Sequence, residues 1–358
     1  MYFLGGWFPR SIFSRFYALC AYIRMILAAL WLVLFSELDY DVVFCDQVSA
    51  CIPVLKLAGV PVVFYCHFPD QLLSSHQSVI LRLYRYPLDW FEEWTTGLAS
   101  IIMVNSQFTA GVFRDTFRSL KNTPVRVLYP SLKSVRATVG LGDPGFELPV
   151  DMGSISGLIP SAFDIIFLSI NRYERKKNVA LGVQALALLS TKLAPQLWSR
   201  VCLVISGGYD PRVPENQEYY EELRGLVTNL GLEKRVIFLR SISDDQKRAL
   251  LACCRAVIYT PANEHFGIVP VEAMNSARPV IAVNSGGPLE TIQHKVTGLL
   301  VEPDSAAFAD AMAQLSQEPS LASQMGDRAR HRVRSLFSFE SFAEALDEIF
   351  RTVVPDRT

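Results

Sequence analysis

The sequence predicts an α/β protein made of two doubly wound domains, each built on a parallel sheet. The chain has 358 residues, which is long enough for two domains with cores of their own. Short apolar runs alternate with longer stretches of helical period, as in parallel sheets covered by helices on their faces. This alternation stops in a stretch with glycines, prolines and serines at residues 131–162 and then restarts, which indicates a linker.

Residues 16–36 form the most apolar part of the chain, 21 residues interrupted by Arg24. At ~1.5 Å per residue such a helix could span a bilayer. Arg10 and Arg15 precede it and would hold that side in the cytosol. Three interpretations remain open: a helix that spans a membrane, a helix that lies in its interface, and a very apolar core helix packed on a sheet.

The first domain is expected at residues 1–130, with 16–36 as its membrane-associated helix. Strands are predicted at 41–45, 61–66, 101–104 and 125–128, and helices around 54–57, 80–97 and 108–117. An open α/β domain normally starts with a strand and a Gly-rich turn. Residues 1–6 are too short a run for that unit, so this domain is expected to be incomplete at its start.

The second domain is expected at residues 163–335, followed by a C-terminal helix within 336–358 that packs back on the first domain. Six strands are predicted, at 165–170, 201–206, 236–239, 256–259, 280–283 and 298–301, with three helices after Glu302. Six strands make a complete doubly wound sheet, whose ligands bind beyond the carboxyl ends of the strands.

The stretch 263–272 follows one of these predicted strands and leads into a helix expected to start near Pro270. Glu264 would lie in the loop and Glu272 early in the helix, so the bend could aim both carboxylates at the hydroxyls of one ligand. The backbone at Gly267 and Ile268 would offer N–H groups to an anion. The alternative is that both glutamates are solvated surface charges.

Strand ends elsewhere carry further candidates. Arg172 and Lys177 lie in the basic turn 171–178, where they could bind a phosphate without a metal; the alternative is a solvated turn. Gly207 and Gly208 would let the backbone approach a ligand, or form a plain turn. Residues 285–290 are a second possible anion cradle or a capped turn.

His67 ends a predicted strand of the first domain, where it could contact a sugar hydroxyl or orient the acceptor. Asp70 is expected to be the nearest carboxylate partner of His67, and a purely structural histidine is the alternative. No metal site is expected, since His67 and His76 stand nine residues apart without a cysteine pair. The net charge of −1 argues against nucleic acid, and seven cysteines without a C-x-x-C pair favour a reducing, cytosol-facing location.

These motifs resemble the GT-B glycosyltransferases of family 4, and within it the dolichol-pathway α-1,3/α-1,6-mannosyltransferases. The resemblance extends over about residues 16–350 and is carried by VVFCDQVSACIPV, FYCHFPD, VNSQFTA, LYPSL, LSINRYERKKN, PANEHFGIVPVEAM and VIAVNSGGPLE. It implies two Rossmann-like domains that face each other across a cleft. The family's first strand and Gly-Gly loop have no convincing counterpart here.

The resemblance further implies a retaining enzyme that moves mannose from GDP-mannose to Man1GlcNAc2-PP-dolichol and then to Man2GlcNAc2-PP-dolichol, without a metal or other cofactor. Arg172 and Lys177 would neutralise the diphosphate, which Gly207, Gly208, Gly267 and Ile268 would approach. Glu272 would bind the ribose, Glu264 would contact the mannose, and His67 would face sugar and acceptor.

The implied location is the cytosolic face of the endoplasmic reticulum membrane. Its implied partners are the dolichyl-diphosphate-linked oligosaccharide, the membrane surface and other dolichol-pathway mannosyltransferases. The incomplete start of the first domain motivates an alternative, an inactive isoform that binds a nucleotide sugar or a partner enzyme at the membrane.

Overall fold

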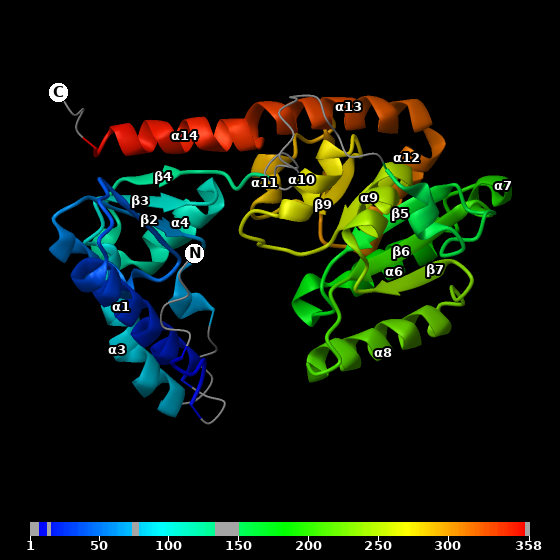
Figure 1. Ribbon diagram of the computed structural model, residues 1–358. Helices are drawn as coiled ribbons and strands as arrows, with labels where there is room; N and C mark the ends of the chain where they lie inside the picture. Colours follow the sequence, from blue (N-terminus) through cyan, green and yellow to red (C-terminus); the bar gives the residue numbers. More distant parts are fainter. Residues whose placement is uncertain (1–6, 13–15, 74–78, 133–149, 355–358) are drawn as a thin grey trace. The chain divides into compact units, whose positions relative to one another are not determined.

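The computed structural model describes residues 7–12, 16–73, 79–132 and 150–354, and the chain forms two units (Figure 1). One unit comprises Met1–Pro130 with Phe342–Thr358, and the other comprises Ser131–Ser341. The expected run 1–6, Arg15, His76 and residues 133–149 of the expected linker lie outside the described residues.

The first unit contains a parallel sheet in the order β1-β2-β3-β4. Its strands are β1 (Val43–Asp46), β2 (Val62–Cys66), β3 (Ile101–Val104) and β4 (Val125–Val127). All four lie within two residues of their predicted bounds, because each apolar run ends at a polar or turn residue. The described α-helices before β4 are α1 (Tyr17–Phe35), α2 (Ile52–Leu55), α3 (Val79–Thr96) and α4 (Gln107–Thr116). A short 3-10 helix precedes α2 and another follows it.

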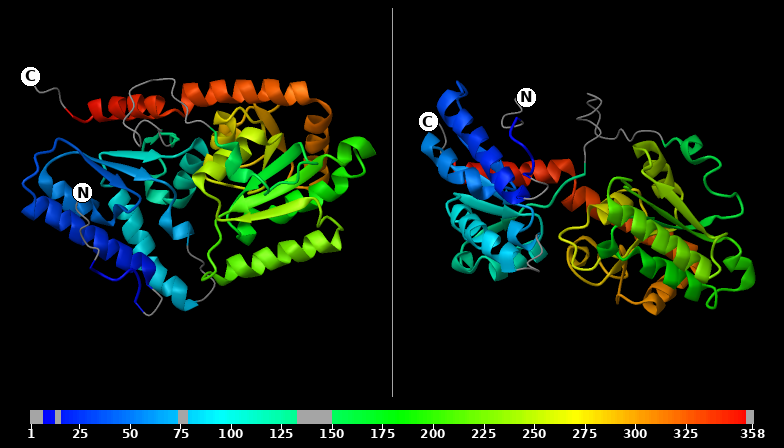
Figure 2. Two further views of the ribbon diagram at one scale, coloured as in Figure 1. Left: turned by 45° about the vertical axis from the view of Figure 1, so that its right-hand side comes forward. Right: turned by 90° about the horizontal axis from the view of Figure 1, so that it is seen from below.

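Side chains of β2 alternate between two apolar layers, as the period of a strand requires. Val62, Phe64 and Cys66 point into a cluster that also contains Ala29 of α1 and Phe113 of α4. On the other side of the sheet, Val63 and Tyr65 contact α14 (Phe339–Arg351) through residues such as Phe342, Leu346 and Ile349. Helices α1 and α14 therefore cover opposite faces of this sheet (Figure 1, Figure 2).

The second unit contains a six-stranded parallel sheet in the order β10-β9-β8-β5-β6-β7. Its strands are β5 (Ile165–Ile170), β6 (Val201–Gly207), β7 (Val236–Arg240), β8 (Ala256–Tyr259), β9 (Val280–Val283) and β10 (Gly298–Val301), which confirms the predicted runs. The chain builds outward from β5 to β7 and then returns to the other side of β5. This reversal makes a switch point between β5 and β8, where ligands bind in such sheets.

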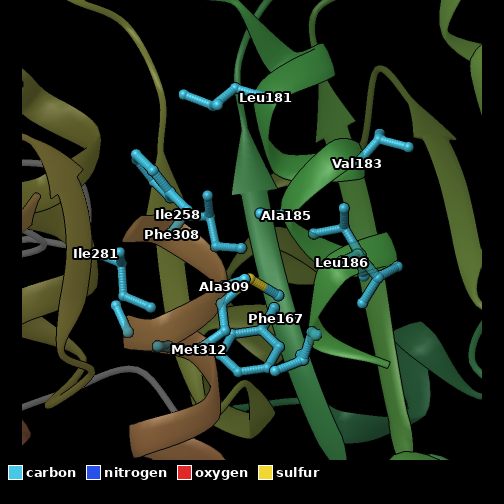
Figure 3. Close-up of a cluster of buried hydrophobic side chains, with 14 of the residues drawn as sticks. Phe167, Leu181, Val183, Ala185, Leu186, Ile258, Ile281, Phe308, Ala309 and Met312 are labelled. Atoms are coloured by element: carbon cyan, nitrogen blue, oxygen red, sulfur yellow. The ribbon is translucent and has the colours of Figure 1, made fainter. Parts of the chain in front are cut away.

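The helices of the second unit lie between these strands and after the last of them. They are α6 (Val179–Leu189), α7 (Pro195–Trp198), α8 (Pro214–Asn229), α9 (Asp244–Cys253), α10 (Ile268–Asn275), α11 (Pro288–Thr291), α12 (Ser305–Gln317) and α13 (Pro319–Leu336). Phe167 of β5, Leu186 of α6 and Phe308 of α12 meet in a core whose side chains are fully buried (Figure 3). Each such side chain contributes roughly 1.5–3 kcal/mol relative to exposure, so the strand ends are held on a rigid base.

Candidate functional site

A cavity of about 360 Å³ lies beyond the carboxyl ends of β5, β6 and β8 in the second unit. It is lined by Ile170, Asn171, Arg172, Lys177, Gly207, Gly208, Tyr259, Glu264, Gly267, Ile268 and Val269. All the predicted site residues of this unit except Glu272 are among them. The cavity sits at the switch point because β5 lies between β6 and β8 in the sheet.

Lys177 and Glu264 form an ion pair in this cavity, although they stand 87 residues apart in the chain. Both side chains are largely buried, and the hydroxyl of Tyr259 donates to the same oxygen of Glu264 at 3.2 Å. Burial acts to raise the pKa of Glu264, but the Lys177 ammonium and the Tyr259 hydroxyl hold that pKa below its ordinary value. Glu264 is therefore ionised at neutral pH, and it lines the cavity.

The basic turn divides its four cations between the cavity and the surface. Arg172, with 63% of its side chain exposed, lines the cavity and pairs with Glu174, while Lys177 points inward to Glu264. Arg175 turns outward to Glu218 and Glu222 of α8. Lys176 also pairs with Glu174. The cluster is therefore part cavity-facing charge and part solvated turn. Phosphate binding by Arg172 and Lys177 stays a prediction.

Gly207 is the point of closest backbone approach in the cavity wall. A Cβ added there would lie 1.9 Å from the carbonyl oxygen of Asn171, so no larger residue fits without moving the ends of β5 and β6. We expect Gly207→Ala to destabilise the protein by about 2–3 kcal/mol, as overpacking does. A lowered melting temperature in calorimetry would show this.

The matched control for that substitution is Gly225→Ala, in the exposed middle of α8, where an added Cβ meets nothing within 4 Å. Alanine there should raise stability by about 0.5–1 kcal/mol, because it favours the helix. Equal melting temperatures for the two variants would contradict the close approach at Gly207.

The Gly286–Gly287 turn supports the loop that carries Glu264. Gly286 has φ +64°, and a Cβ there would lie 2.6 Å from the Glu264 carbonyl oxygen; one on Gly287 would lie 2.4 Å from Phe266. The N–H of Gly287 donates to that carbonyl at 2.7 Å, and Asn263 N–H donates to the Ser285 hydroxyl at 3.0 Å. This turn packs against the Glu264 loop, which favours a positioning role over the predicted second anion cradle.

Helix α10 begins at Ile268, two residues before the predicted start at Pro270. Gly267 takes a left-handed conformation with φ 83° and turns the chain into the helix, and proline is tolerated in a first helical turn because its N–H is not needed there. The first helical residues, Ile268 and Val269, line the cavity. The positive end of the helix dipole is thus directed at it.

Glu272 lies one turn further along α10 and does not line the cavity. Its Oε2 is 2.5 Å from the Nζ of Lys247 on α9, and both side chains are about a quarter exposed. A ligand that takes hydroxyl groups to Glu272 would have to share or displace Lys247. The sequence did not indicate that Lys247 would pair with Glu272, because Lys247 lies on a helix and belongs to none of the candidate motifs.

His67 belongs to the first unit, at the carboxyl edge of its sheet. Its Nε2 lies 2.8 Å from Oδ1 of Asp46, which ends β1. Its backbone N–H donates to the Gln47 side chain, and its carbonyl accepts from Asn105, the residue after β3. The expectation that Asp70 is the carboxylate partner of His67 was therefore wrong.

Asp70 pairs instead with Arg85 of α3 at 3.1 Å. The loop after His67 turns it toward that helix, away from the imidazole. Sequence proximity was misleading because neighbouring strand ends, not neighbouring residues, meet at the edge of a parallel sheet. Asp46, as the last residue of the adjacent strand, could have been found from the strand order.

Family models and relatives agree with this architecture. The model described as "Glycosyl transferases group 1" matches residues 161–332, and that described as "Glycosyltransferase Family 4" matches residues 6–133. Among solved structures, sucrose-phosphate synthase from Thermosynechococcus elongatus superposes with a TM-score of 0.67 at 22% identity, covering 95% of this chain and 80% of that one. Anabaena Alr3699/HepE, solved in complex with UDP, superposes with a TM-score of 0.68 at 22% identity, covering 92% of this chain and 82% of that one. These likenesses confirm the predicted GT-B fold class.

Curated relatives are considerably closer in sequence. The chain is 51% identical to the alpha-1,3/1,6-mannosyltransferase ALG2 of Homo sapiens over 346 residues, which are 96% of this chain and 81% of the relative. It is 44% identical to the Dictyostelium discoideum protein of the same name, over 97% of this chain and 84% of that one. With this similarity over nearly its whole length, the chain belongs to the ALG2 family of alpha-1,3/1,6-mannosyltransferases.

Proposed function

We propose that this chain is a retaining mannosyltransferase that moves mannose from GDP-mannose to Man1GlcNAc2-PP-dolichol and then to Man2GlcNAc2-PP-dolichol, forming α-1,3 and α-1,6 linkages. Family membership supports the reaction class, a nucleotide-sugar donor and a lipid-linked oligosaccharide acceptor. The observation in the structure that carries the proposal is the Lys177–Glu264 pair in a cavity at the switch point. No comparison favours the inactive alternative.

The donor's diphosphate is assigned to the cationic side of the cavity. Arg172 offers a fork of N–H donors and Lys177 a compact charge, and the start of α10 adds backbone N–H groups at Ile268 and Val269. Gly207 and Gly208 also line the cavity, where their backbone could face phosphate oxygens. These groups together supply the charge that a metal ion supplies in other sites.

Glu264 is assigned to the mannose and Glu272 to the ribose. An ionised, partly buried carboxylate stabilises positive charge as it develops at the anomeric carbon. The bond from that carbon to the β-phosphate oxygen breaks while its bond to the acceptor oxygen forms on the same face. The acceptor hydroxyl gives its proton to the departing phosphate, so GDP and the lengthened oligosaccharide are the products. Glu272 would exchange Lys247 for the ribose hydroxyls.

His67 is assigned to the sugar and acceptor, and Asp46 is assigned to holding its ring. The 2.8 Å contact between Asp46 and His67 keeps one ring nitrogen engaged and so sets the orientation of the other. We assign the enzyme to the endoplasmic reticulum, which its membership of the ALG2 family supports. We assign it to the cytosolic face, which the seven free cysteines support because a reducing compartment keeps thiols unpaired.

Donor specificity gives the direct test of this proposal. GDP-mannose and GDP at roughly 100 times their dissociation constants should stabilise the protein by about 2.7 kcal/mol, seen as a rise of several degrees in melting temperature. UDP-glucose at the same concentration should give a smaller rise. Transfer of labelled mannose to a mannosylated chitobiosyl lipid is the companion assay. A melting temperature that GDP-mannose leaves unchanged would rule out the assigned donor.

A further inference from the structure

Helix α3 carries an apolar stripe on its outer side that nothing in the described residues covers. Leu83, Tyr86, Trp90 and Trp94 follow one another at helical spacing, and between 45% and 77% of each residue is exposed. The opposite side of the helix is in the core, with Arg85 and Glu92 at 3% and 6% exposed. Large aromatic side chains gathered in one exposed row are unusual on a soluble surface and mark a contact site. We call these four residues the α3 stripe.

The α3 stripe lies beside α1 because the next row of α3 packs on that helix. The ring centroids of Tyr84 and Phe16 lie 5.1 Å apart, and those of Phe91 and Tyr22 lie 6.3 Å apart. The Tyr84 hydroxyl also accepts from the N–H of Leu19. Successive residues of a helix are turned by about 100° about its axis, so Leu83 and Trp90 lie beside Tyr84 and Phe91. The α3 stripe is therefore the row next to the one that contacts α1, and it faces outward.

Helix α1 is apolar far beyond what its own packing explains. Among the described residues it is the one helix long and apolar enough to cross a membrane, by length and composition alone, yet only 17% of its most apolar window is buried. One side of it, at Met25, Ala29 and Leu32, packs along the core of the first unit. A helix with one side in a protein core is not surrounded by lipid, which favours the interfacial interpretation over a free spanning helix.

We propose that the α3 stripe and the exposed side of α1 form one face that lies in the headgroup region of a phospholipid bilayer. Tyrosine and tryptophan suit that depth, since each has an apolar body and a polar edge. A bilayer is favoured over a protein partner because the row of α3 next to the stripe contacts α1, and α1 is itself apolar and mostly unburied. The inference rests on the proposed function in one respect, that the acceptor is itself anchored in lipid.

The same helix holds the loop that follows His67. Glu92 of α3 accepts from the N–H of Asp70 at 2.7 Å and from that of Gln71 at 3.1 Å, and Arg85 pairs with Asp70. Docking of α3 would therefore keep the His67 loop at a constant distance from the membrane surface. This gives the acceptor-side residues a defined height above the lipid to which the acceptor is attached.

Tryptophan fluorescence tests the depth of the α3 stripe directly. Trp90 and Trp94 are kept, while Trp7, Trp31 and Trp198 are replaced by phenylalanine, and the full-length variant is reconstituted into phosphatidylcholine vesicles. Lipid brominated near the headgroup should quench its emission roughly two-fold, and lipid brominated at the chain end should quench it less, for a depth of about 5–10 Å. Cooperative melting confirms that each variant is folded.

The matched control keeps Trp198 alone, which packs under Arg235 in the second unit at 4.3 Å. Its emission should be insensitive to brominated lipid. Vesicle-bound protein whose Trp90 and Trp94 stay unquenched would overturn the inference, as would quenching equal to that of Trp198. Self-association that shields both tryptophans from lipid would assign the face to a second copy and overturn it too.

Transfer activity is measured separately, with a short-chain, water-soluble acceptor. Quenching without transfer would count against the proposed function and leave the docked face standing. Transfer without quenching would support the proposed function and overturn the docked face.

Discussion

Replacing Glu264 with glutamine is expected to lower kcat by about 10²–10³-fold, the typical effect of losing one group that stabilises charge in a transition state. Glutamine keeps the size of the side chain and the hydrogen bond from Tyr259, but it removes the negative charge that faces the cavity. Because the donor's diphosphate is assigned to other residues, the KM for GDP-mannose should change far less than kcat. Steady-state kinetics with labelled donor separates the two.

Glu221→Gln is the matched control for that substitution. Glu221 is exposed on α8, where it pairs with Arg224 in an i,i+3 contact, and such pairs contribute little. It should leave both kinetic constants and the melting temperature unchanged. If Glu264→Gln retained more than a tenth of the wild-type kcat while remaining folded, Glu264 would not be the group that faces the anomeric carbon.

Replacing Lys177 with methionine should lower kcat/KM by about 10²–10³-fold, because one positive charge assigned to the diphosphate is lost. Methionine is nearly as long as lysine and keeps the packing against the wall of the cavity. Unlike Glu264→Gln, this change should raise KM for the donor as well as lower kcat. Lys177→Arg, which keeps the charge, is the matched control for the pH dependence described next.

The pH dependence of the Lys177 variant distinguishes this pairing from a purely structural one. In the wild type the pKa of Glu264 lies below its ordinary value, so activity that needs its ionised form is lost only as pH falls through that low pKa. Without the ammonium, the raising effect of burial is no longer opposed by Lys177, and the pKa rises. The acid limb of the plot of kcat against pH should then move to higher pH. An acid limb that stays in place would show that Lys177 does not set the ionisation of Glu264.

The second unit could be predicted closely from the sequence because its strands are continuous apolar runs that end at polar or glycine residues. Where a strand such as β8 ends, the side chains that follow it must lie at the carboxyl edge of the sheet. For this reason the sequence pattern was sufficient to assign Arg172, Gly207 and Glu264 to the same edge, and the cavity confirms that they meet there.

Pairings between side chains could not be predicted in the same way. Lys177 turns to Glu264, Glu272 turns to Lys247 and His67 turns to Asp46, and each pair joins residues of different elements. Which charges meet depends on how loops and helices pack around the strand ends, and sequence distance carries little information about that. The expectation of Asp70 beside His67 failed for this reason.

By itself, the sequence determined the two parallel sheets, the edge at which the site lies and the family, because these follow from local apolar pattern and motifs that survive without three-dimensional context. The tertiary structure alone decided which cations face the cavity and which face water, since Arg175 and Lys177 stand two residues apart in one short turn and point to different partners. It also shows that one side of α1 packs on the core of the first unit, through Met25, Ala29 and Leu32. The sequence pattern of an apolar helix does not reveal which of its sides makes such contacts.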